Sequence, residues 1–238
     1  MFVVTGGGTG IGRAVASALH ERGDRVLVTG RRAAPLAALS QEAGGGIEFL
    51  ACDNSDPADA RRLAESVTEP VDGLVLCAGG NPAIGRPEPE SLADVAALLD
   101  ETMASNVRSA ALTVAALESR LADGASVVLF GSIAAEHGVG FYGPAKAAVA
   151  SYAVGLAARL GTRGITVNCL APGYVTDTEF FRGGMTRERE EQLRGQTMTG
   201  RVGALSDVVA CVLFLLSPQA RHVTGQTIHL NGGAVTTR

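Results

Sequence analysis

The chain has 238 residues and a net charge of −4, and 46% of its residues are hydrophobic while only 4% are aromatic. This length suits one α/β domain with a large core, and the absence of any run of Lys and Arg excludes a nucleic-acid-binding patch. The longest apolar stretch, residues 208–216, is too short to span a bilayer, so we expect no membrane partner and a cytoplasmic protein.

The four cysteines predict no metal site. They form no C-x-x-C pair and show no zinc-like spacing with the four histidines. Isolated cysteines are usually small, buried apolar residues, and we expect this of Cys52, Cys77, Cys169 and Cys211.

Strand-like and helix-like stretches alternate along the chain. An apolar strand at residues 2–5 leads through a glycine loop into a helix at 11–22, and strands at 25–29, 47–51 and 73–77 alternate with helices at 35–43 and 58–66. Next come helices at 92–99 and 103–121, a strand at 126–130, a helix at 142–160 and a strand at 165–170. A polar stretch at 177–201 precedes a helix at 208–216 and a strand at 227–230. Repeated strand–helix–strand units with continuous apolar strands indicate a parallel sheet covered on both faces. We therefore predict the α/β class, as a single doubly wound Rossmann domain over residues 1–238 with about seven parallel strands.

A glycine loop, TGGGTGIG, lies between the first strand and the first helix. Gly6, Gly10 and Gly12 allow a tight turn and a close approach of the backbone to a pyrophosphate, and the helix N-terminus supplies N–H groups. Three residues separate Gly6 from Gly10, and one separates Gly10 from Gly12. We predict that this loop, with Thr9 and Ile11, binds a dinucleotide; the alternative is a purely structural turn.

Tyr142 and Lys146 form a Y-x-x-x-K pattern at the start of a predicted helix, and their spacing places both side chains on one helix face. A phenol is a poor acid or base at neutral pH, and a nearby ammonium group is expected to lower its pKa. Ser132 follows the strand segment VVLFG, and the carboxyl ends of parallel strands line the ligand crevice. The three residues predict proton transfer to or from a carbonyl or alcohol.

The glycine spacing and the set of Ser132, Tyr142 and Lys146 resemble the short-chain dehydrogenase/reductase family. The resemblance covers essentially the whole chain and is strongest to 3-oxoacyl-carrier-protein reductase-like members. It implies that Tyr142 is the catalytic acid/base and that Ser132 polarises the substrate. It further implies that Lys146 contacts the cofactor ribose and shifts the tyrosine pKa.

Further site residues follow from the same resemblance. Asn106, in SNVRSA, matches the helix asparagine that supports a water-linked proton relay in this family, although a polar residue in a helix kink is the alternative. Asp53 matches the residue that hydrogen-bonds the adenine amino group, and Asn54 follows it. The segment LCAG departs from the family's NNAG, so only backbone contacts of Ala78 and Gly79 with the adenine ribose are expected.

The segment APGYV resembles the family's turn beside the nicotinamide. It places Pro172 and Gly173 in the turn and makes Val175 a backbone partner of the carboxamide. An extra residue then leaves two candidates for the next cofactor-binding threonine, Thr176 and Thr178, of which we favour Thr178.

The end of the second strand indicates the cofactor. Family members that use NAD hold the ribose hydroxyls with an acidic residue here, whereas this chain has Gly30 followed by Arg31 and Arg32. Guanidinium groups suit a 2′-phosphate, so NADP(H) is the expected cofactor. Thr9 departs from the basic residue that many NADP-dependent members carry in the glycine loop. Solvated loop arginines are the alternative.

The family resemblance also indicates a type of substrate and an oligomeric state. Residues 177–201 match the family's substrate lid, where Phe180, Phe181 and Met185 either cover a hydrophobic substrate or pack helices. Arg163 matches one position that contacts an acyl-carrier protein, which makes this protein a candidate partner. The segment TGQTIHLNGG resembles the family's tetramer-forming end, so we expect a homotetramer.

Three functions therefore remain open at this stage. The first is an NADP(H)-dependent reductase acting on a ketone, with a 3-oxoacyl or polyketide-like substrate as a candidate. The second is a catalytically silent nucleotide sensor on the same fold, against which the intact Ser132, Tyr142 and Lys146 set argues. The third is an NAD-dependent alcohol dehydrogenase, against which Gly30 and Arg31 argue.

Overall fold

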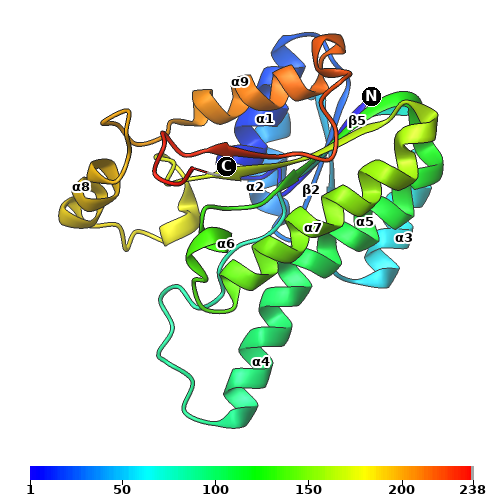
Figure 1. The fold of residues 1–238 in the computed structure, drawn as a ribbon. Helices are drawn as coiled ribbons and strands as arrows, with labels where there is room; N and C mark the ends of the chain where they lie inside the picture. Colours follow the sequence, from blue (N-terminus) through cyan, green and yellow to red (C-terminus); the bar gives the residue numbers. More distant parts are fainter. Residues whose placement is uncertain (237–238) are drawn as a thin grey trace.

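One parallel sheet of seven strands forms the centre of the molecule (Figure 1). The computed structural model describes residues 1–236. The strand order is β3-β2-β1-β4-β5-β6-β7, and every neighbouring pair is parallel. The predicted α/β class and the sheet of about seven strands are confirmed. The strands are β1 (Phe2–Thr5), β2 (Val26–Gly30), β3 (Ile47–Ala51), β4 (Val71–Leu76), β5 (Leu121–Phe130), β6 (Thr166–Pro172) and β7 (Thr227–Leu230).

Helices cover both faces of the sheet because successive strand residues point to opposite sides. Val4 and Val75 pack into a buried cluster with α1, α2 and α9, whereas Val3 and Leu74 pack into a second cluster with α3, α5 and α7. Figure 1 shows α4 projecting away from the sheet and α8 lying apart from it. The helices are α1 (Gly10–Glu21), α2 (Ala33–Glu42), α3 (Pro57–Ser66), α4 (Leu92–Met103), α5 (Ser109–Leu117), α6 (Ala134–His137), α7 (Tyr142–Leu160), α8 (Arg187–Gly195) and α9 (Leu205–Leu216).

The order in which strands are added to the sheet reverses between β1 and β4. From β1 the order runs outward through β2 and β3, and from β4 it runs the other way through β5, β6 and β7. The connections that leave β1 and β4 therefore run to opposite sides of the sheet, and ligands bind at the carboxyl ends of such strands in folds of this kind.

The predicted helix at 103–121 is wrong in its continuity and its end. A π-helical turn, η1 (Ala104–Arg108), separates α4 from α5, and β5 already begins at Leu121. Side chains bond to backbone carbonyls at this turn, since Asn106 Nδ2 donates to the Thr102 carbonyl and Ser109 Oγ donates to the Ser105 carbonyl. Such bonds to carbonyls four residues back compete with the regular helix ladder.

The polar stretch at 177–201 has structure of its own. It contains the 3-10 turn η4 (Glu179–Phe181) and the helix α8, which begins after Thr186 caps it by accepting a bond from Arg189 N. Along residues 1–236, no helix is both long and apolar enough to cross a membrane, and the same residues contain no cluster of metal-binding side chains.

Candidate active site

The glycine loop is shaped for close backbone approach. Gly6 and Gly10 have φ angles of +66° and +53°, which favour glycine. A Cβ atom on Gly6 would lie 2.9 Å from the Ala78 backbone N, and one on Gly12 would lie 2.4 Å from the Gly6 carbonyl oxygen. A side chain at Gly6 would push apart the loops after β1 and β4, and one at Gly12 would push α1 away from the glycine loop.

The first turn of α1 keeps donors available for an anion. Thr9 is the N-cap of α1, yet its side chain accepts no hydrogen bond from the first-turn N–H groups. Those N–H groups have no partner within the helix either. Together with the open glycine loop, they fit the pyrophosphate of a dinucleotide. The geometry thus supports the predicted roles of Gly10, Ile11 and Gly12.

Ser132, Tyr142 and Lys146 meet at the carboxyl edge of β5. Ser132 lies two residues beyond the strand end and accepts a hydrogen bond from Ala134 N at 3.1 Å. Tyr142 and Lys146 lie on the first turns of α7 and are only 8% and 5% exposed. Lys146 Nζ donates to the Phe130 carbonyl at 2.8 Å and lies 5.6 Å from the centre of the Tyr142 ring. The predicted catalytic residues therefore share one buried site.

Burial shifts the pKa of both ionisable groups toward their neutral forms. It lowers the pKa of Lys146 from 10.5 to about 8, because an ammonium group loses its water. It raises the pKa of Tyr142 to about 12, and the Ser132 hydroxyl only partly opposes this effect. The pKa of Tyr142 is therefore raised and not lowered as expected, because desolvation of the phenolate is the largest influence.

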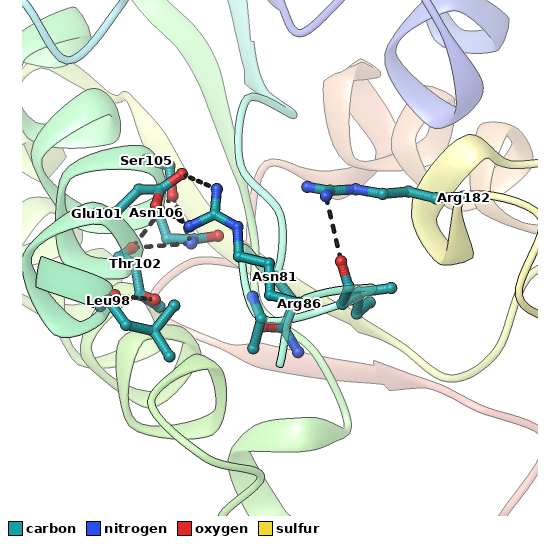
Figure 2. Close-up of polar contacts among 10 residues, drawn as sticks. Asn81, Arg86, Leu98, Glu101, Thr102, Ser105, Asn106 and Arg182 are labelled. Atoms are coloured by element: carbon teal, nitrogen blue, oxygen red, sulfur yellow. Dashed lines mark hydrogen bonds and ion pairs between the residues drawn. The ribbon is translucent and has the colours of Figure 1, made fainter. Parts of the chain in front are cut away.

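Asn106 holds the loop that follows β4. Its Oδ1 accepts from Gly80 N at 3.1 Å, and its Nδ2 donates to the Gly80 carbonyl at 2.8 Å. The same Nδ2 donates to the Thr102 carbonyl at 2.9 Å (Figure 2). A Cβ on Gly79 would lie 2.6 Å from Asn106 Oδ1 and 3.4 Å from Lys146 Nζ. The π-helical turn thus sets the β4 loop beside the lysine, a role for Asn106 that the relay prediction did not include.

The residues predicted to bind the adenosine end of the cofactor differ in how far their side chains are already bonded to other residues. Arg31 is exposed, whereas Arg32 pairs with Glu179 at 2.8 Å. One carboxylate oxygen of Asp53 accepts from the Ser55 N–H and hydroxyl. The buried Asn54 side chain bonds only to core groups, so a cofactor contact from this residue would have to involve its backbone. Those core groups are the hydroxyls of Thr29 and Thr113.

The segment after β6 crosses the glycine loop. Pro172 is buried at the end of β6, and a Cβ on Gly173 would lie 3.0 Å from Asn231 Cβ. Thr178 Oγ1 donates to the Val175 carbonyl at 3.2 Å, and a Cβ on Gly10 would lie 3.7 Å from the Thr178 side chain. Of the two threonines, Thr178 is therefore the one beside the dinucleotide loop.

Aromatic side chains from the segment 177–201 lie against the catalytic tyrosine. The ring centre of Phe180 is 5.6 Å from that of Tyr142, and Phe181 packs at 5.0 Å from Phe180 and 5.6 Å from Tyr174. Phe180 therefore covers the catalytic site and does not join a helix interface. The FF pair was the only sequence signal for it.

Two arginines anchor the loop opposite this segment. Arg86 bonds both Glu101 carboxylate oxygens, at 2.5 and 2.9 Å, which ties the loop after β4 to α4. From the other side, Arg182 donates to the Ile84 carbonyl at 3.1 Å (Figure 2). The sequence analysis did not identify either contact, because each joins residues from separate elements.

Comparison with known proteins agrees with this geometry. The family model described as Enoyl-(Acyl carrier protein) reductase matches residues 6–235. The 3-oxoacyl-[acyl-carrier-protein] reductase of Escherichia coli is 31% identical, over 97% of this chain and 95% of that protein.

Solved structures agree as well. A short-chain type dehydrogenase/reductase from Mycobacterium ulcerans superimposes with a TM-score of 0.88 at 31% identity, covering 98% of this chain and 88% of the other. A blue fluorescent protein from a metagenomic library, in complex with NADPH, gives a TM-score of 0.87 at 30% identity, covering 99% and 97%. The chain belongs to the short-chain dehydrogenase/reductase family of oxidoreductases.

Proposed function

We propose that the protein reduces a ketone to an alcohol with NADP(H), using Tyr142 as the proton donor. The observation behind this proposal is the meeting of Ser132, Tyr142 and buried Lys146 at the strand edge beside the glycine loop. A bound nicotinamide would supply the hydride. The chain's own residues then have to orient the carbonyl and deliver a proton to its oxygen.

The protonation state of Tyr142 fits the role of a proton donor. With a pKa raised to about 12, Tyr142 is protonated at neutral pH and is ready to donate to a developing alkoxide. The Ser132 hydroxyl can donate to the same oxygen, and charged Lys146 stabilises the phenolate that remains. Alcohol oxidation would need the phenolate first, which burial disfavours.

The phosphate-binding end supports NADP(H). Gly30 provides no carboxylate that would repel a 2′-phosphate, and Arg31 is exposed beside it. The NADPH-bound relative of similar fold is consistent with this preference. The sequence-based alternative, in which both arginines are solvated loop charges, predicts no preference between the cofactors.

A 3-oxoacyl group is the substrate that we favour. The named relative from Escherichia coli is a 3-oxoacyl-carrier-protein reductase, and the apolar Phe180 ring beside Tyr142 suits an acyl chain. Arg163 is a poor candidate for carrier-protein docking, since its guanidinium bonds Asp123 and the carbonyls of Glu118 and Leu121. Docking would therefore rely on other residues.

A homotetramer in the cytoplasm remains our expectation for the assembled protein. Apolar side chains on α4 and α7 support assembly, because Leu99 and Val154 are 39% and 53% exposed in the single chain. A second copy of the chain would bury such exposed apolar side chains.

Turnover of a panel of ketones and acyl thioesters with NADPH tests the proposal. We expect Tyr142→Phe to lower kcat by about a hundredfold or more, the usual loss when a general acid is removed, with little change in cofactor affinity. Tyr152→Phe is the matched control, since Tyr152 lies on the same helix but packs against the core. Near-normal turnover in Tyr142→Phe would contradict the mechanism. Cofactor binding without turnover of any compound would favour the silent sensor.

A further inference from the structure

A short segment after β6, which we call the strap (residues 177–182), spans both ends of the crevice. It begins with Asp177 and ends with Arg182, whose φ angles are +58° and +50°. Residues other than glycine seldom adopt this left-handed conformation, because the Cβ atom crowds the backbone. The strap is therefore held in place by its contacts and not by the preference of its own backbone.

Those contacts fall on the dinucleotide side and on the catalytic side. Thr178 lies against Gly10 of the glycine loop, and Glu179 pairs with Arg32 at 2.8 Å. Phe180 packs against Tyr142, as described above. The strap therefore connects the glycine loop and Arg32 with the Tyr142 ring.

Arg32 lies where the protein would bind the 2′-phosphate of a dinucleotide. Gly7 N donates to the Thr29 carbonyl at 3.1 Å, so the end of β2 lies beside the glycine loop. Arg32 Nη2 lies 3.5 Å from Thr9 Oγ1 and also donates to Glu179 Oε2. Both side chains of the ion pair are 63% exposed, so the pair is open to competition from another anion.

We propose that Glu179 occupies the 2′-phosphate site on Arg32 and thereby reduces the preference of the enzyme for NADPH over NADH. This inference rests on the proposed use of NADP(H). A 2′-phosphate takes Arg32 from Glu179 and releases the strap at its dinucleotide end. NAD(H) has no group that competes for Arg32, so the ion pair persists when it binds.

The ion pair therefore lowers affinity for NADPH and leaves affinity for NADH unchanged. Exposed pairs of this kind change an equilibrium constant by about two- to fivefold. Glu179→Gln keeps the size of the side chain and removes the charge. We expect it to tighten NADPH binding by about two- to fivefold and to increase the preference over NADH by the same factor.

The experiment measures Kd for NADPH and NADH from the fluorescence of the dihydronicotinamide. Glu188→Gln is the control, because Glu188 is an exposed glutamate of the neighbouring helix α8 that takes part in no ion pair within residues 1–236. It should leave both constants unchanged. An unchanged or weaker NADPH affinity in Glu179→Gln overturns the inference, and thermal melting verifies that the variants are folded.

A double substitution separates competition from simple charge repulsion. In an Arg32→Ala background, Glu179→Gln should no longer tighten NADPH binding, because the guanidinium for which Glu179 and the 2′-phosphate compete is absent. A gain that persists there overturns the competition for Arg32. If wild type binds NADPH no more tightly than NADH, it is instead the proposed cofactor preference that fails.

Discussion

Replacing Lys146 with methionine tests how strongly burial acts on the catalytic ammonium group. Burial lowers the pKa of Lys146 from 10.5 to about 8. A shift of this size corresponds to a destabilisation of about 3 kcal/mol when the buried lysine is charged at pH 7. The methionine removes that penalty but leaves the Phe130 carbonyl without its donor, which costs about 1–3 kcal/mol. At pH 7 Lys146→Met should therefore be as stable as wild type, or more stable by up to about 2 kcal/mol.

The pH dependence gives the sharper test. The folded protein releases the lysine proton near pH 8, whereas the unfolded chain holds it until about pH 10.5. The unfolded state thus binds more protons in this window, so wild-type stability rises with pH there. Between pH 7 and pH 10 this group adds about 2.5 kcal/mol to wild type and nothing to Lys146→Met.

Urea unfolding at pH 7, 8.5 and 10, followed by circular dichroism at one protein concentration, measures the difference between the two proteins. Comparing the variant with wild type cancels the titration of groups that do not interact with Lys146. Burial raises the pKa of the two thiols that do, Cys77 and Cys169, so in the folded protein they stay largely neutral up to pH 10. The pKa of Lys146 can also be measured directly, because it is the only lysine in the sequence. Protein labelled with ¹³C at lysine Cε should show one lysine resonance that titrates near pH 8. A midpoint near 10.5, or a stability difference that stays constant with pH, would refute the reasoning.

Two further predictions concern the cofactor and the assembly. Wild type should prefer NADPH over NADH by about ten- to a hundredfold in kcat/KM, and Gly30→Asp combined with Arg31→Ala should reverse this preference. The structure has room for the aspartate, since a Cβ on Gly30 would meet nothing closer than Leu36 at 3.9 Å. Equal use of both cofactors by wild type would show that the arginines are only solvated charges. Light scattering at micromolar concentration should find a tetramer, and a clean monomer would disprove the assembly.

Local sequence patterns determined much of the fold. The alternation of apolar strands and helices predicted the sheet, and the bounds predicted for residues 142–160 and 227–230 agree with α7 and β7. These elements depend on short-range periodicity and on breakers close in sequence, which a single chain displays directly.

Part of the candidate site was also visible in the sequence. The glycine loop and the Y-x-x-x-K pattern placed Gly6, Gly10, Tyr142 and Lys146 at the edge of the sheet, because both lie where a predicted helix begins. Residue type and spacing sufficed there, since helical geometry fixes which side chains share a face.

Other features depended on contacts between distant segments. Burial decided the pKa of Tyr142, and the direction expected from the neighbouring lysine was wrong because desolvation depends on everything packed around the ring. Similarly, the break between α4 and α5 comes from side-chain bonds within the helix, including the one from Asn106 that also reaches Gly80.

The amino-acid sequence by itself determined the class of fold, and it predicted the dinucleotide loop and the roles of Ser132, Tyr142 and Lys146. Only the tertiary structure decided that Thr178 and not Thr176 faces Gly10, and that Glu179 pairs with Arg32 across 147 positions of sequence. The physical reason is the distance along the sequence over which each interaction acts. Backbone preference and periodicity act over a few residues, whereas charge pairing and desolvation depend on which segments the folded chain brings together.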